Sequence, residues 1–137
     1  MLELANALVL MLLGAMLFFP SVVAPVVFTS LPEAQAGAFL RAMFPRYYAF
    51  TIVLSLVAAL LFLVANGESA SQATFACVFI GVSTIWVRQW LLPRINLARD
   101  AQLTGDADAG RRFDRNHKLS VGINLFQLVL LAGIQFV

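Results

Sequence analysis

Four apolar stretches dominate the chain and leave few residues for any other kind of structure. They cover roughly residues 4–28, 47–65, 74–92 and 119–137, and three polar connections separate them. Each stretch holds about 19 to 25 residues, and at about 1.5 Å rise per residue such a helix matches a hydrocarbon core of about 30 Å. The pattern predicts one all-α domain over residues 1–137, an integral membrane four-helix bundle.

The composition supports lipid as the solvent of this chain. Of its 137 residues, 61% are hydrophobic and only 12% are charged, whereas a soluble domain has about 25% charged residues. The first stretch has no basic segment before it and is longer than the apolar core of a cleaved signal peptide. We therefore expect it to be a retained membrane helix.

The basic residues are distributed unevenly along the chain. All nine lie in or beside the first and third connections, and the N-terminus, the second connection and the C-terminus hold none. Lys and Arg near helix ends are retained on the cytoplasmic side, so the pattern predicts an N-out, C-out, multi-pass membrane protein. Aspartates interrupt the basic runs, and we do not expect nucleic acid as a partner. The nine residues are Arg41, Arg46, Arg88, Arg94, Arg99, Arg111, Arg112, Arg115 and Lys118.

The two basic connections are expected to contain helical extensions. Pro32 marks a helix start in the first connection, and apolar residues after it would lie against the membrane surface. In the third connection, residues 94–102 continue the third helix and residues 111–118 begin the fourth. A loop at residues 104–110 would join them into a short cytoplasmic hairpin.

Polar residues follow one face of the fourth predicted helix. His117, Ser120, Asn124 and Gln127 are separated by three or four residues, which places them on one side of a helix. One interpretation is hydrogen bonding between helices. The other treats Arg88, His117 and Asn124 as the wall of a site near the cytoplasmic interface.

The same residues carry a family resemblance. The chain contains Phe44-Pro-Arg-Tyr-Tyr, then Arg88-Gln-Trp-Leu-Leu-Pro-Arg, then His117-Lys-Leu-Ser-Val-Gly-Ile-Asn. In this order, and among four hydrophobic segments, they resemble the transmembrane protein 205-like family over essentially the whole chain. The resemblance implies a compact four-helix membrane protein of the bacterial kind, which we expect in the inner membrane, and it implies no established reaction. The family pattern has an asparagine near position 88, where this chain has Arg88.

The side chains available for chemistry are few. The chain has one His and one Cys, Cys77, and no carboxylate inside an apolar stretch. We therefore expect no enzyme activity, no metal and no cofactor. Two alternatives stay open: a quinone or lipid contact near Trp90, Arg94 and His117, and a haem shared by two His117 residues across a homodimer.

The sequence favours a binding role over catalysis. We expect an accessory or assembly subunit, or interaction module, of a larger membrane complex, with membrane lipids and a protein partner or second copy around it. The alternative is a homo-oligomeric small-molecule or metal-efflux component with a polar site near His117 and Asn124. The candidate polar face comprises Arg88, Trp90, Arg94, His117, Ser120 and Asn124.

Overall fold

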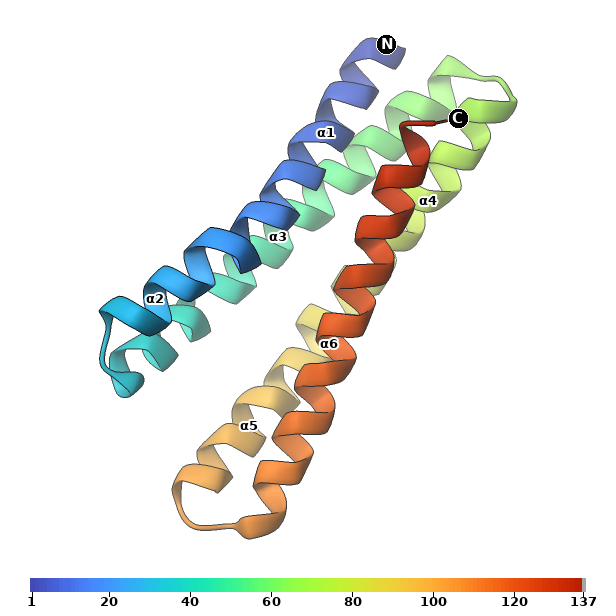
Figure 1. The fold of residues 1–137 in the computed structure, drawn as a ribbon. Helices are drawn as coiled ribbons and strands as arrows, with labels where there is room; N and C mark the ends of the chain where they lie inside the picture. Colours follow the sequence, from blue (N-terminus) through green and yellow to red (C-terminus); the bar gives the residue numbers. More distant parts are fainter. Residues whose placement is uncertain (137) are drawn as a thin grey trace.

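The computed structural model describes residues 1–136, and these residues are helical over almost their whole length (Figure 1). No strand occurs among them, so the predicted all-α class is confirmed. Val137, the last residue of the fourth predicted stretch, lies outside the described residues. The elements in chain order are α1 (Leu2–Phe18), η1 (Phe19–Val23), α2 (Ala24–Ser30), α3 (Glu33–Ala65), α4 (Glu68–Trp86), η2 (Val87–Leu91), α5 (Leu92–Leu103) and α6 (Ala107–Ile134).

These elements join into four long helical rods. The first runs over Leu2–Ser30, the second over Glu33–Ala65, the third over Glu68–Leu103 and the fourth over Ala107–Ile134. Each contains a window long and apolar enough to cross a membrane, with mean hydropathies of 2.4, 2.6, 1.5 and 1.4 in that order. The structure thus has the number of membrane-length helices that the sequence predicts.

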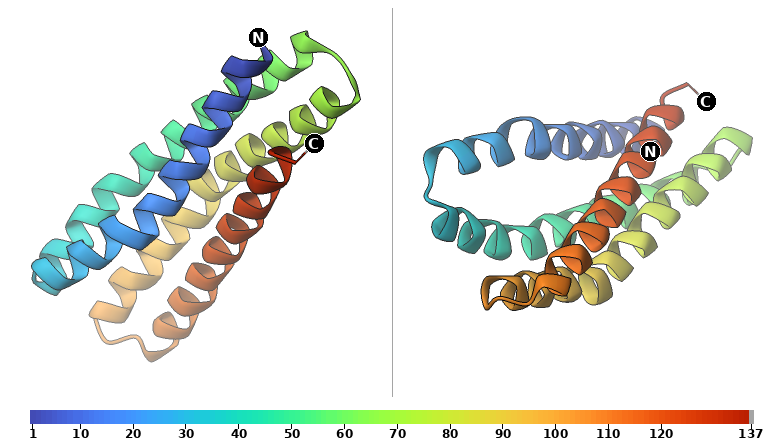
Figure 2. Two further views of the ribbon diagram at one scale, coloured as in Figure 1. Left: turned by 45° about the horizontal axis from the view of Figure 1, so that its top comes forward. Right: turned by 60° about the horizontal axis from the view of Figure 1, so that its bottom comes forward.

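The chain ends and the connections divide between the two ends of the molecule. Both termini and the α3–α4 turn lie at one end, and the α2–α3 and α5–α6 connections lie at the other (Figure 1). Figure 2 shows α1 and α2 beside α3, and α6 beside α4 and α5, as two antiparallel pairs. The α3–α4 contact joins the pairs and is the most extensive in the molecule.

Prolines account for the two π-helical turns. The turn η1 contains Pro20 and precedes Pro25, and η2 ends two residues before Pro93. A proline lacks the backbone donor and its ring crowds the carbonyl four residues earlier. A wider turn relieves this crowding without ending the helix. Pro20 and Pro25 therefore coincide with a local change of helix type.

The first connection differs from the surface helix that we expected. The helix does begin after Pro32, but α3 continues without a break through Pro45 to Ala65. Its 33 residues span about 50 Å at 1.5 Å per residue, more than a hydrocarbon core needs. Near Pro45, Arg46 donates from Nη1 to the carbonyl of Ala42 at 2.6 Å. The Arg46 side chain thus donates to a helix carbonyl close to Pro45, a residue that has no backbone N–H to donate.

Small residues let α3 and α4 approach closely. A Cβ atom at Gly81 would lie 2.7 Å from Cδ2 of Leu56 and 3.1 Å from Oγ of Ser55. Small residues are common where membrane helices pack backbone against backbone. The short turn between the two helices uses Asn66 and Gly67 with φ of 57° and 111°, so Gly67 provides a conformation that other residues rarely adopt.

The apolar core lies toward the end that carries the termini. It draws on four helices, with buried side chains repeating every three or four residues, as expected for helices that pack along one stripe. The core residues are Ala5, Val9, Leu12, Met16, Ala58, Ala59, Phe62, Ala70, Ala73, Cys77, Ile80 and Leu131.

The α5–α6 hairpin is more helical than the sequence suggested. The predicted loop over residues 104–110 is only three residues long, because α6 already begins at Ala107. Asp106 precedes that start, and its carboxylate accepts from the backbone amides of Asp108 at 2.9 Å and Ala109 at 3.2 Å. This is an ordinary N-cap, and it satisfies donors that a helix start otherwise leaves unpaired.

Candidate functional site

Gln127 makes the central polar contact inside the bundle. Its side-chain amide on α6 donates to Oγ of Ser83 at 2.8 Å and to Oγ1 of Thr84 at 3.1 Å, both on α4. Gln127 and Thr84 are buried. Both hydroxyls in turn donate to carbonyls of their own helix, so each polar group of this contact has a partner within the bundle.

A small polar space lies beside this contact. Its volume is about 10 Å³, and its lining includes Tyr48, Thr84, Ser120, Asn124 and Gln127. A cavity needs about 10–15 Å³ to hold one water molecule. The space therefore suits a single water at most, and a small-molecule substrate does not fit it in this conformation.

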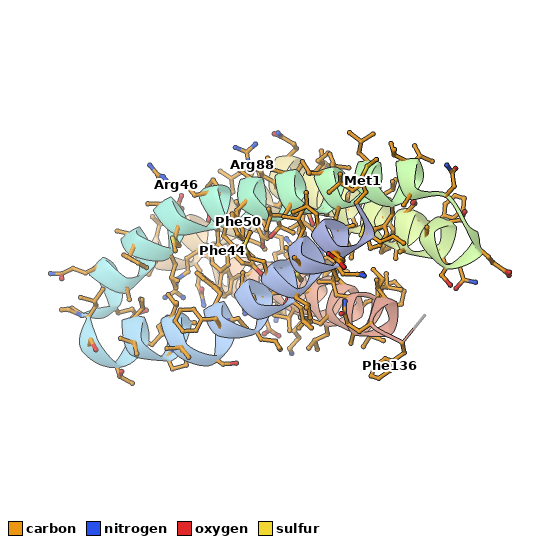
Figure 3. All side chains as sticks on the ribbon, turned by 90° about the horizontal axis from the view of Figure 1, so that it is seen from above. Met1, Phe44, Arg46, Phe50, Arg88 and Phe136 are labelled. Carbon is orange, nitrogen blue, oxygen red and sulfur yellow. The ribbon has the colours of Figure 1, made fainter. Side chains whose placement is uncertain are left out.

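Arg88 does not line that polar space. Its Nε donates to the carbonyl of Pro45 at 3.2 Å, which ties η2 to α3 rather than to α6. Figure 3 shows Arg88 and Arg46 on the side of the molecule formed by α3. Arg88 and Asn124 therefore face different neighbours.

Trp90 and Arg94 belong to a separate, exposed row on the third rod. The rings of Trp86 and Trp90 stack with centroids 4.8 Å apart. The guanidinium carbon of Arg94 lies 3.5 Å from the centre of the Trp90 ring, a cation–π contact. All three side chains are exposed, as in the aromatic belts that mark the interface of membrane proteins.

His117 lies on the exposed surface of α6. Its ring stacks on that of Phe113, with centroids 5.8 Å apart and planes inclined by 2°. The Ser120 hydroxyl donates to the His117 carbonyl at 2.7 Å, and Ser120 and Asn124 line the small polar space. The six residues of the predicted polar face thus separate into an α3 contact, a tryptophan–arginine row, and a stripe along α6.

Several participants in these contacts were not among the predicted site residues, and three of them are instructive. The carbonyl of Pro45 is one, and only the structure reveals it, because sequence does not show which helix an arginine will face. Tyr48, which lines the polar space, is another. Gln127, the third, was placed by its spacing on the same polar helix face as Asn124, but it was not included among the six site residues.

Ion pairs hold the two pairs of helices together at the basic end. Arg41 on α3 binds Asp100 on α5 with its two terminal nitrogens, at 2.7 and 3.2 Å, and Arg99 on α5 pairs with Glu33 on α3. The hydrogen bond from Arg41 holds the pKa of Asp100 below its ordinary value. These pairs connect α5 with the start of α3.

The fold and these contacts define an all-α protein with four helices of membrane-spanning length and apolarity, joined by amide, hydroxyl and ionic contacts. Within residues 1–136, no three His, Cys, Asp or Glu side chains gather as metal ligands do. The chain belongs to the family described as "Domain of unknown function (DUF4149)", which matches residues 7–103. The match ends before α6, so it covers Arg88, Trp90 and Arg94 but not the polar stripe.

A relative extends the similarity over almost the whole chain. A protein of Aquifex aeolicus (strain VF5), named "Uncharacterized protein", is 30% identical over 132 residues, which are 96% of this chain and 91% of the relative. An alignment of that extent includes most of α6. No solved structure matches the chain.

Proposed function

We propose that the protein is an N-out, C-out subunit of the bacterial inner membrane whose role is to bind other components of a membrane complex. It would act as an accessory or assembly subunit or interaction module rather than as an enzyme. The resemblance to the transmembrane protein 205-like family, carried by Trp90, Pro93, Arg94, His117, Ser120 and Asn124, is part of this proposal.

The observation that supports the proposal is that uncharged polar groups lie inside the bundle, whereas the salt bridges lie at its basic end. Inside the bundle, Gln127, Ser83 and Thr84 bond to one another, and among residues 1–136 no buried side-chain nitrogen or oxygen lacks a partner. Satisfied groups of this kind hold helices together. The salt bridges found among residues 1–136 lie instead on the α5–α6 hairpin and the start of α3, where they are accessible to a partner.

The exposed arginines of α6 are the best candidates for a docking element. Arg111, Arg112 and Arg115 are exposed. Arg111 and Arg112 are paired with Asp108 and Asp106. Exposed ion pairs contribute little stability and exchange partners readily. A partner with an acidic surface could therefore replace them at small cost.

Transport is the second candidate, and the polar space beside Asn124 favours it. Its lining combines hydroxyl and amide groups from α4 and α6 with Tyr48 of α3. A homo-oligomer could enlarge this space by separating α6 from α4, and substrate-dependent flux into liposomes would then be measurable. The size of the space in one copy, about 10 Å³, favours the binding role.

Purification from native membranes at endogenous expression tests the proposal. Gentle detergent or nanodisc extraction, read by mass spectrometry and an absorption spectrum, should give a recurrent complex larger than the protein alone. A variant with Arg111→Gln and Arg115→Gln should lose the partner, whereas Arg111→Lys with Arg115→Lys, which keeps the charge, should retain it. A colourless homo-oligomer without a partner would contradict the proposal and favour transport.

A further inference from the structure

An open apolar groove lies between α4 and α6 on the outside of the molecule. Its volume is about 460 Å³. Apolar groups form most of its wall, and a Cβ atom at Gly122 would meet open space there. Its one hydroxyl, that of Ser83, is already bonded to Phe79 and Gln127, so no unpaired polar group opposes an apolar occupant. The lining residues are Phe79, Ser83, Lys118, Leu119, Gly122, Ile123 and Phe126.

The length of the groove corresponds to one leaflet of a bilayer. Phe79 and Phe126 meet edge to face at its apolar end, with ring centroids 5.6 Å apart, and Lys118 lies at the other end. The distance from Lys118 to Phe126 along α6 is about 12 Å at 1.5 Å per residue. Half of a hydrocarbon core is about 15 Å, so the groove is nearly long enough to extend from the midplane to the interface.

One cation, Lys118, lines the interfacial end of the groove, and a second, Arg94, lies further along the third rod. Lys118 is exposed, and its partner Asp114, 2.7 Å away, is also exposed, so this pair is weak. On α4, the groove residues Phe79 and Ser83 are followed at helical spacing by Trp86. Trp90 stacks on Trp86, and Arg94 lies over the ring of Trp90. Among residues 1–136, Arg94 forms no ion pair with a carboxylate. Its guanidinium is held in place by Trp90 and retains its hydrogen-bond donors for a ligand.

We propose that this groove binds an anionic phospholipid from the leaflet at the basic end of the protein. One acyl chain lies between Phe79, Gly122 and Phe126, and the headgroup phosphate is bound by Arg94 and Lys118. Guanidinium groups bind phosphate oxygens in a planar, two-bond geometry, and basic residues at a membrane surface favour anionic over zwitterionic lipids. The inference rests on the membrane insertion contained in the proposed function, and it does not depend on a protein partner.

The two tryptophans make the site directly measurable. The chain has only two, and both belong to the row that ends in Arg94, so all tryptophan fluorescence reports on the proposed headgroup contact. The full-length protein would be reconstituted into phosphatidylcholine vesicles containing either brominated phosphatidylglycerol or brominated phosphatidylcholine, since bromine quenches tryptophan on contact. We expect the anionic lipid to quench at several-fold lower mole fraction. Equal quenching by the two lipids would overturn the proposal.

Charge variants separate a bound headgroup from general surface attraction. Arg94→Gln and Lys118→Gln should each weaken the preference for brominated phosphatidylglycerol by about fivefold. Arg111→Gln removes an equal charge from the far part of the hairpin and should leave the preference unchanged. An equal loss in all three variants would indicate diffuse attraction and overturn the site.

Groove variants test the position of the acyl chain. Gly122→Leu places a side chain in the groove and should reduce the preference several-fold. Gly133→Leu is the matched control, because it lies on the same helix, also faces open space and does not line the groove. Indistinguishable quenching in these two variants, with helical content intact by circular dichroism, would contradict the proposal.

A second copy of the chain is the competing occupant of this groove. In a Cys77→Ala background, Gly122→Cys would give efficient disulfide cross-linking between copies if two grooves faced each other, and that result would overturn lipid binding.

Lipid binding and the proposed function can fail separately. Loss of the preference for anionic lipid, in a protein that still purifies with a partner, would refute lipid binding alone. A lipid preference in a protein that purifies without a partner would refute the proposed function alone.

Discussion

Gln127 on α6 donates to the hydroxyl of Thr84 on α4 across 3.1 Å, at a point where both side chains are buried. The contact joins two helices whose other facing residues are largely apolar. Apolar side chains do not strongly discriminate between a neighbouring helix and lipid, because both surroundings are equally apolar. The amide–hydroxyl contact therefore fixes the register of α6 against α4.

Loss of this contact should destabilise the packing of α6. Gln127→Leu and Thr84→Val each remove one partner while keeping side-chain volume. We expect each to lower the free energy of unfolding by about 0.6–2 kcal/mol, the range found for hydrogen bonds between membrane helices. Unfolding in detergent micelles, followed by circular dichroism, measures the change.

The double variant shows whether the two residues act together. If the contact stabilises the bundle, Gln127→Leu combined with Thr84→Val should cost less than the sum of the single changes. Gln72→Leu is a suitable control for the loss of an amide, because Gln72 is exposed and lies on α4, the helix that also carries Thr84. Strict additivity would indicate that the bond contributes nothing to the register.

The sequence predicts much of this arrangement because membrane solvation allows few alternatives. Backbone groups in lipid must be bonded internally, so four long apolar stretches lead to four helices. Helical spacing also places Ser120, Asn124 and Gln127 on one face, and in the structure all three line the small polar space that Thr84 of α4 also lines. These features depend on local periodicity, which a single sequence contains.

Other features depend on how the helices lie against one another. The sequence does not show that Pro45 would remain inside α3, because that helix is stabilised by its packing as well as by its own residues. It also does not show that Arg88 would donate to the Pro45 carbonyl rather than face Asn124. If the third rod were rotated by half a turn about its axis, Arg88 would face a different helix. The apolar residues of the rod do little to determine this rotation, because they can face lipid as well as another helix.

The contact of Arg88 with Pro45 should depend on the guanidinium and not on charge alone. Arg88→Lys keeps the positive charge but cannot place a donor where Nε lies, so the carbonyl loses this hydrogen bond. We expect a loss of about 1 kcal/mol in the free energy of unfolding. Arg115→Lys, at an exposed position of α6, should have almost no effect. Equal stabilities of the two variants would show that the bond is dispensable.

The contact between α3 and α5 at the basic end should loosen in acid. The hydrogen bond from Arg41 lowers the pKa of Asp100 and raises that of Arg41, so Arg41 stays charged throughout. A carboxylate with a depressed pKa stabilises the folded state above its unfolded pKa of about 4, and this contribution is lost as the pH falls through the lower folded value. The pair is therefore intact at neutral pH.

Spin labels at Gln35→Cys and Leu103→Cys, in a Cys77→Ala background, would follow this change. We expect a narrow distance distribution at neutral pH that broadens below about pH 4. Asp100→Asn should give the broad distribution already at neutral pH. Asp108→Asn is the matched control, because Asp108 pairs with Arg111 on its own helix and does not join α3 to α5. An unchanged distribution in the Asp100→Asn variant would show that the remaining pair, Arg99 with Glu33, is sufficient.

The position of the basic residues predicts the orientation of the whole protein in the membrane. Both termini and the α3–α4 turn lie at one end of the molecule, and the α5–α6 connection lies at the other (Figure 1). Basic residues are retained on the cytoplasmic side, so Ser69→Cys should face outward and Thr104→Cys inward. In a Cys77→Ala background, a membrane-impermeant maleimide applied to spheroplasts should label Ser69→Cys at once, and Thr104→Cys only after permeabilisation. Both positions are exposed, so a difference in labelling reports the side of the membrane rather than burial. Labelling of Thr104→Cys from outside would reverse the orientation and place the basic hairpin and its lipid groove in the opposite leaflet.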